Sequence, residues 1–146
     1  MQVSDLLRQK GTEVITIPGN AKAREAMGKL VENRIGAIIV TDADGTPQGI
    51  VTERDFLWLS FAQGDAFKEL PVSEIMTKKL IICLLTDSLD YAMTVMTTNR
   101  IRHLPILDGP RLAGIISIGD VVKANLSETL ATNRYLQDYV YGHYTV

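Results

Sequence analysis

Cysteine, histidine and aromatic residues are scarce in this sequence of 146 residues. It contains one cysteine and two histidines, and aromatic residues make up 6% of the chain. A single cysteine, Cys83, excludes an internal disulfide, so we expect a reducing, cytoplasmic location. Because His103 and His143 are far apart in the sequence and only one cysteine accompanies them, no metal-ligand spacing emerges, and we expect no metal site.

Long apolar runs and an excess of positive charge are also absent. No apolar run approaches the roughly 18–20 residues that cross a bilayer, and residues 1–10 lack the apolar region of a signal peptide. We therefore expect no membrane association. The formal net charge of −2 argues against a dedicated nucleic-acid-binding protein, which would normally be basic.

Catalytic motifs are missing as well. The sequence has no Gly-x-Ser-x-Gly, no Walker loop and no Gly-x-Gly-x-x-Gly. Its carboxylates are scattered over predicted helix faces. We predict no enzyme activity and no catalytic cofactor.

The sequence does contain an internal repeat. Segment 49–55 (Gly-Ile-Val-Thr-Glu-Arg-Asp) recurs as 114–120 (Gly-Ile-Ile-Ser-Ile-Gly-Asp), and segment 3–7 recurs as 72–76. In 49–55 and 114–120 an apolar run meets a hydroxyl residue, and an Asp follows three positions later. This pattern is typical of a strand that runs into a helix N-terminus, where unpaired backbone amides attract anions.

Each copy is predicted to form a β-α-β-β-α unit, because apolar or β-branched runs alternate with amphipathic segments. A unit this small cannot bury both of its faces alone, so the two units should share a core. We divide the chain into a first unit with its linker (1–70), a second unit (71–125) and a helical tail (126–146). The predicted strands are 13–17, 36–40, 48–51, 80–85, 103–107 and 112–116, and the predicted helices are 20–34, 88–99 and those that begin at Thr52 and Ser117.

The repeated motifs resemble a tandem pair of cystathionine β-synthase (CBS) domains. The match is carried by residues 49–55, 100–106 and 114–120 and covers nearly the whole chain. The resemblance implies an α/β fold (α+β in some schemes) of two repeats with pseudo-twofold symmetry, called a Bateman module. It also implies a disc-like homodimer that binds an adenine nucleotide (AMP, ADP, ATP, an NAD-type dinucleotide such as NADH, or S-adenosylmethionine) between the repeats and regulates an unknown partner protein.

By this resemblance, Asp55 and Asp120 would accept hydrogen bonds from ribose hydroxyls. Thr52 and Ser117, with the helix N-terminal amides, would hold the phosphate. A simpler interpretation is that these hydroxyl and acidic residues only cap their own helices. Both interpretations can hold at once.

Basic residues next to the second unit's central strand are further candidates for phosphate binding. Arg102 and His103 precede that strand, whereas the first unit has Gly36 and Ala37 at the matching positions. Conversely, Gly119 of the second unit replaces Arg54 of the first. The two clefts should therefore differ, with the stronger anion site where Arg102, His103 or Arg54 converge, although the sequence leaves open which cleft that is. A solvated basic rim is the alternative.

The resemblance also implies an apolar slot for adenine, with core packing as the alternative, above all for the cysteine. Its members would be Ile17, Ala37, Cys83 and Pro105.

Three aspects of the chain's interactions stay open at this stage. The tail, with Tyr135, Tyr139, Tyr141 and Tyr144, either caps its own domain or meets a second copy of the chain. Trp58 is expected, with Phe61, to fill an interface between the halves or between protomers. The main hypothesis is a nucleotide-sensing homodimer; the alternatives are an interaction module with empty clefts and, more weakly, a single-stranded nucleic-acid binder that lacks a stacking platform.

Overall fold

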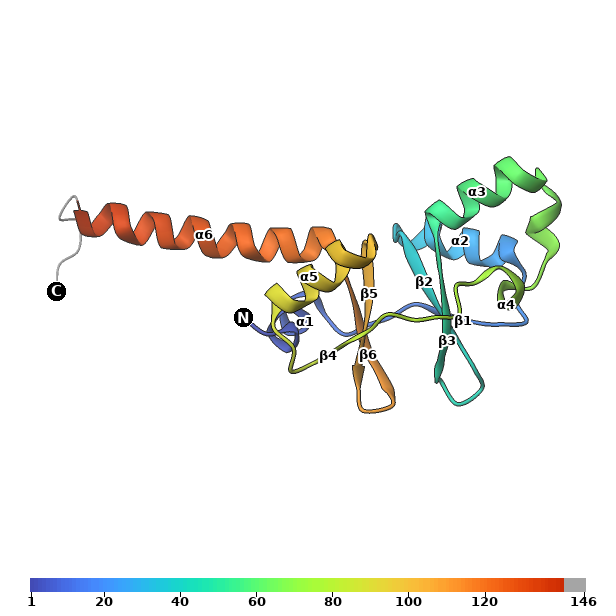
Figure 1. Ribbon diagram of the computed structural model, residues 1–146, viewed down its shortest axis with the longest axis horizontal. Helices are drawn as coiled ribbons and strands as arrows, with labels where there is room; N and C mark the ends of the chain where they lie inside the picture. Colours follow the sequence, from blue (N-terminus) through green and yellow to red (C-terminus); the bar gives the residue numbers. More distant parts are fainter. Residues whose placement is uncertain (141–146) are drawn as a thin grey trace.

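The computed structural model describes residues 1–140 and contains two three-stranded sheets, one from each repeat (Figure 1). In the first, β1 (Thr16–Pro18) pairs parallel with β2 (Ala37–Thr41), which pairs antiparallel with β3 (Pro47–Thr52). The second sheet repeats this order with β4 (Cys83–Leu84), β5 (His103–Asp108) and β6 (Arg111–Ser117). The predicted α/β fold of two related units is confirmed.

One helix connects the two parallel strands in each repeat. These crossover helices are α2 (Ala23–Asn33) and α5 (Leu89–Asn99), and each buries apolar residues spaced at three and four positions. Both end at an arginine in the left-handed conformation, Arg34 (φ 53°) and Arg100 (φ 55°). The strands before them are shorter than the predicted 13–17 and 80–85, because only the residues opposite β2 or β5 find a ladder partner.

The first helix of each repeat packs in the core of the other repeat (Figure 1). Helix α1 (Val3–Lys10) starts at the second repeat, where the Val3 amide donates to the Asp87 carbonyl at 2.9 Å. Helix α4 (Val72–Ile75) does the same in the first repeat, where the Val72 amide donates to the Ala21 carbonyl at 2.7 Å. Val3 and Val72 are both fully buried, so each repeat depends on the other to close its core.

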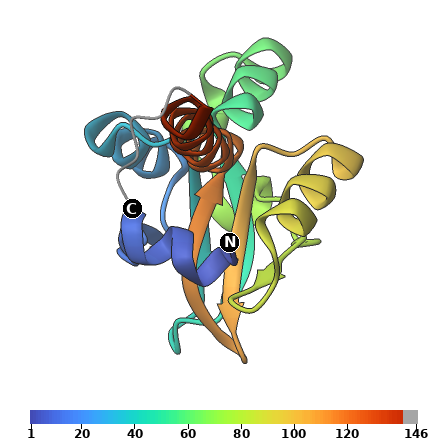
Figure 2. The same ribbon diagram turned by 90° about the vertical axis from the view of Figure 1, so that its left-hand side faces the viewer.

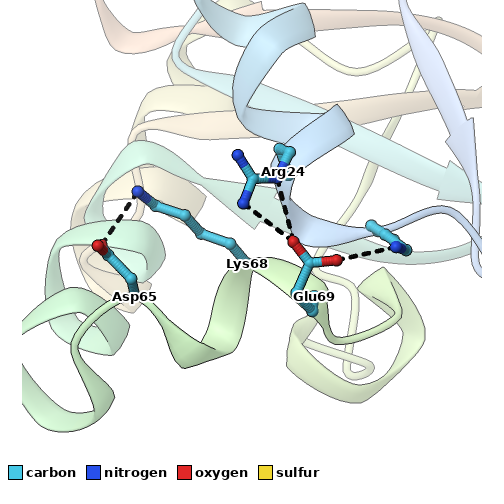
Figure 3. A network of polar contacts seen from close by, with 5 residues as sticks. Arg24, Asp65, Lys68 and Glu69 are labelled. Atoms are coloured by element: carbon cyan, nitrogen blue, oxygen red, sulfur yellow. Dashed lines mark hydrogen bonds and ion pairs between the residues drawn. The ribbon is translucent and has the colours of Figure 1, made fainter.

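The linker between the repeats folds back on the first repeat. It comprises the 3-10 helix η1 (Ala66–Glu69), which follows α3 (Glu53–Gln63), the last helix of the first repeat. Exposed ion pairs border it: Glu69 accepts from Lys22 and Arg24, and Lys68 pairs with Asp65 (Figure 3). Such exposed pairs contribute little to stability. The stronger attachment is Phe67, which is fully buried with its ring centroid 6.1 Å from that of Phe56.

The chain's last described element is one continuous helix of 23 residues, α6 (Ile118–Val140), which extends well beyond the body (Figure 1). Figure 2 looks nearly along it. The second unit's last helix and the predicted tail are therefore a single element, without a break near residue 125. Val121 and Ala124 are buried, whereas Leu126, Leu130 and other apolar residues farther along are exposed. Tyr141 and Tyr144 lie outside the described residues.

Trp58 and Phe61 do not fill an interface between the halves, and that part of the prediction is wrong. Their side chains are 66% and 88% exposed. The reason is helical periodicity, because Phe56 is the residue of α3 that points into the core, which turns Trp58 and Phe61 outward. In the part of the chain that the structure describes, no helix combines the length and apolarity needed to span a membrane.

The helix exchange predicts a large difference between two valine-to-alanine substitutions. Val72→Ala in α4 removes fully buried atoms and should lower the free energy of unfolding by about 2 kcal/mol. Val31→Ala in α2 removes atoms from a side chain that is 77% exposed and should change it by less than about 0.5 kcal/mol. Urea denaturation measures both, and similar values for the two variants would contradict the exchange.

Candidate functional site

A cavity of about 520 Å³ lies between the two repeats. The N-terminus of α3 forms one side, residues 100–105 of the second repeat form another, and the segment that follows α4 closes it. Small-molecule sites typically measure about 300–1,000 Å³. The exchange of α1 and α4 creates this arrangement, because it brings the segment after α4 to the corner where β3 turns into α3.

Asp55 combines a capping role with an open oxygen in this cavity. Its Oδ2 accepts hydrogen bonds from the Thr52 amide at 2.8 Å and from Thr52 Oγ1 at 3.2 Å, while the Asp55 amide donates to Thr52 Oγ1 at 3.4 Å. Thr52 and Asp55 thus form a capping box. No residue within 1–140 donates a hydrogen bond to the other carboxylate oxygen, Oδ1. Helix capping and ligand binding are therefore compatible roles for Asp55.

Four basic side chains line the cavity: Arg54, Lys79, Arg100 and Arg102. Within residues 1–140 none of them makes a side-chain hydrogen bond or an ion pair. The acidic residues on the same wall are Glu53 and Asp55, so positive charge is in excess. Unpaired guanidinium and ammonium groups that converge on a partly enclosed space are well suited to bind phosphate.

Arg54, Arg102 and His103, the three residues whose convergence was expected to mark the stronger anion site, all line the cavity that Asp55 borders. Sequence reasoning missed two basic residues there. Arg100 was not among the predicted phosphate-binding residues; it ends α5 in the left-handed conformation and lines the cavity. Lys79 lies in a segment without regular structure, and only its repeat relation to Lys10 could have indicated it.

His103 crosses from the second repeat toward Gly36 of the first. A Cβ atom at Gly36 would lie 2.9 Å from His103 Nε2, too close for a real contact. The glycine that stands where the second unit has Arg102 therefore makes room for this imidazole. Burial lowers the pKa of His103, against the opposing effect of the Glu53 carboxylate, so the ring is a neutral hydrogen-bonding group near pH 7.

The apolar part of the wall differs from the predicted adenine slot. Pro105 lines the cavity, together with Ile50, Leu80, Ile81 and Ile101. Ile17, Ala37 and Cys83 lie in the cores of their repeats, at most 5% exposed, and none of them borders this cavity. Burial, with Asp87 nearby, raises the pKa of the Cys83 thiol to about 11, so it packs as a small apolar group.

The corresponding corner of the second repeat is closed by a lysine. Asp120 Oδ2 accepts from the Ser117 amide at 2.8 Å and from Lys10 Nζ at 2.6 Å. Burial alone would raise the pKa of Asp120, but the hydrogen bonds from Lys10 and Ser117 outweigh it and hold the pKa below its usual value. Ser117, Gly119 and Asp120 border neither the 520 Å³ cavity nor the two described next.

Two further cavities adjoin the first one. One of about 540 Å³ shares Glu53 and His103 with it and extends along α2 past Gly36. The other, of about 300 Å³, shares Arg54, Arg100 and Arg102 and reaches α5. The three arginines therefore line two adjoining hollows, whereas Lys79 lines only the first.

A protein-family model described as "CBS domain" matches the chain twice, over residues 3–61 and 72–127. The mitochondrial CBS domain-containing protein CBSX3 of Arabidopsis thaliana is 33% identical over 151 residues, which cover 97% of this chain and 73% of that protein.

Solved structures give the same result. A CBS-domain containing protein from Agrobacterium tumefaciens is 48% identical with a TM-score of 0.81, over 85% of this chain and 98% of the other. A CBS domain protein from Pyrobaculum aerophilum, solved in complex with AMP, is 29% identical with a TM-score of 0.74, over 82% and 89%.

The lowered pKa of His103 predicts a pH dependence of stability. As the pH falls below about 6.5, the unfolded chain takes up a proton that the folded protein resists, so the folded state loses stability until the folded pKa is passed. The free energy of unfolding, measured in urea between about pH 7.5 and 5, should therefore decrease toward acid. In the variant His103→Gln this decrease should be smaller, because every other titrating group, His143 included, is common to both proteins. Equal slopes would contradict the interpretation.

Proposed function

The chain belongs to the CBS-domain family, as its repeated motifs predicted, and from this we propose that it binds an adenine nucleotide in the cavity between its repeats. One observation carries the proposal: a carboxylate with an open oxygen, four basic side chains that have no partner within residues 1–140, and an apolar wall face the same partly enclosed space. These three features match the ribose, the phosphates and the base of a nucleotide. The AMP complex of the Pyrobaculum relative supports this choice of ligand.

In this proposal each part of the nucleotide meets a different element. Asp55 accepts from the ribose hydroxyls through Oδ1, while Oδ2 continues to cap α3. The Thr52 hydroxyl, the amides at the start of α3 and the Arg102 guanidinium bind the phosphate. The base lies against the apolar residues, of which Pro105 was predicted from the sequence. His103, being neutral, contributes a hydrogen bond rather than a charge.

The charge of the cavity bears on which nucleotide fits. Four basic and two acidic side chains leave an excess of two positive charges around the open space. A single phosphate monoester carries between about −1.5 and −2 charges near neutral pH, which this excess can neutralise. The charge of AMP therefore matches the excess positive charge of the cavity.

We also propose a homodimer formed through exposed apolar residues that the repeat places at equivalent positions. Leu57 and Phe61 on α3 correspond to Val122 and Leu126 on α6, and all four side chains are at least 50% exposed. Clustered exposed apolar side chains are typical of interaction surfaces. In this proposal the dimer is a regulatory module without catalytic activity that reports nucleotide binding to a separate protein. The same surface would serve an interaction module with empty clefts, which is the competing function.

Thermal unfolding with and without AMP, ADP, ATP and NADH tests nucleotide binding. A ligand present at about 100 times its Kd stabilises the folded state by about 2.7 kcal/mol, an easily measured increase in melting temperature. Asp55→Ala should remove most of this increase. Its matched control is Asp120→Ala, which loses the equivalent helix cap but should keep the nucleotide-induced increase. No increase with any of the four nucleotides would contradict the proposal.

The dimer is tested by the variant Phe61→Glu/Leu126→Glu. Placing two carboxylates on the apolar surface should convert the dimer to a monomer in analytical ultracentrifugation, while nucleotide binding is retained, because neither residue lines the cavity. Val31→Glu, on an exposed face of α2, is the control and should remain dimeric. A wild-type monomer, or a variant that still dimerises, would exclude this surface.

A further inference from the structure

Two lysines at equivalent positions of the repeat have different surroundings. Lys10 and Lys79 stand the same distance after the repeated segments 3–7 and 72–76. Lys79 lines the Asp55 cavity and, within the described residues, makes no side-chain hydrogen bond or ion pair. Lys10 is bound on two sides: its Nζ donates to Asp120 Oδ2 at 2.6 Å and to the Ile115 carbonyl at 2.8 Å.

The length of the exchanged helix explains the difference. Helix α4 ends at Ile75, so Thr77 is extended and exchanges two backbone hydrogen bonds with Ile50, at 2.9 and 3.0 Å. These bonds occupy the Ile50 carbonyl, and Lys79 is left facing the cavity. Helix α1 is eight residues long and stays helical through Lys10, so no such pairing forms with Ile115. The Ile115 carbonyl then accepts from the ammonium group of Lys10 instead.

Lys10 occupies the place that a ribose would need in the second cleft. In the proposed Asp55 site a sugar hydroxyl donates to the motif carboxylate; in the second repeat a lysine already donates to that carboxylate. The contact is partly enclosed, with the Lys10 and Asp120 side chains 36% and 26% exposed. Because Lys10 belongs to the same chain, it competes at a high effective concentration with any free ligand.

We infer that each chain binds one nucleotide, in the Asp55 cleft, and that Lys10 holds the Asp120 cleft closed. This inference rests on the proposed nucleotide binding and adds which cleft is used and which residue decides it. Removal of the Lys10 ammonium frees Asp120 and the Ile115 carbonyl together, which gives the second corner the same open carboxylate that the first one has. Lys79, the equivalent residue in the open cleft, contributes to phosphate binding.

Isothermal titration calorimetry with AMP, carried out on the full chain, measures the stoichiometry. Wild type should bind one AMP per chain, and Lys10→Met should bind a second one more weakly, because the second corner lacks counterparts of Arg54 and Arg102. Lys79→Met is the matched control, because it removes the equivalent lysine; it should still bind one, about tenfold more weakly. Two AMP per wild-type chain, or one per chain in Lys10→Met, would overturn the inference. If the variant Asp55→Ala still binds one AMP per chain, the inference would also be overturned, because the nucleotide would then occupy the Asp120 cleft.

A second measurement keeps this inference separate from nucleotide binding itself. The Asp120 carboxyl can be titrated by NMR without ligand, and Lys10→Met should raise its pKa while Lys79→Met leaves it unchanged. If neither wild type nor Lys10→Met binds AMP but the Asp120 pKa rises as expected, the proposed function fails and the closure by Lys10 stands. An Asp120 pKa that does not respond to Lys10→Met overturns the closure.

Discussion

The reciprocal exchange of the first helix is the constraint on which the rest of this structure depends. Val3 fills the core of the second repeat and Val72 fills that of the first, both with no exposed surface. Because each of these short helices is packed in the core of the other repeat, it also fixes the position of the residues that follow it. The segments that follow α1 and α4 are therefore delivered to the corners where β6 and β3 turn into helices, and the space between the repeats is bordered by residues from both.

That constraint also generates the difference between the two clefts. Helix α1 has eight residues and α4 has four, so equivalent lysines arrive in different positions. Further asymmetry comes from two exchanges of glycine and arginine: Gly36 stands where the second repeat has Arg102, and Gly119 stands where the first repeat has Arg54. Basic side chains therefore gather at the Asp55 corner, while the charge of Asp120 at the other corner is neutralised by Lys10.

Much of this could be predicted from the sequence, because repetition doubles every local signal. The strand-to-helix corners at Thr52 and Ser117 follow from a hydroxyl and an Asp at capping distance, and both capping boxes are present in hydrogen bonds. The exchange could not be predicted, because an apolar pattern such as that of residues 3–7 shows that a helix face is buried but not against which partner. The outward position of Trp58 was missed for the same reason, since an aromatic side chain on a helix does not reveal which face the core takes.

The positions of some of the basic side chains around the cavity also could not be predicted from the sequence. The arrangement of the basic side chains explains why the cavity is suited to an anion. Nothing in the sequence distinguishes Arg100 from a surface charge, although it lines the cavity from the end of α5. Together with Arg54, Lys79 and Arg102 it forms a cluster of like charges that repel one another in a partly enclosed space. The cores avoid such a cost, because no polar or charged residue within 1–140 is fully buried. A nucleotide whose ribose met Asp55 on one repeat and whose phosphate met Arg102 on the other would relieve that repulsion and link the two repeats, so occupancy of this cleft would strengthen the junction that the exchanged helices form.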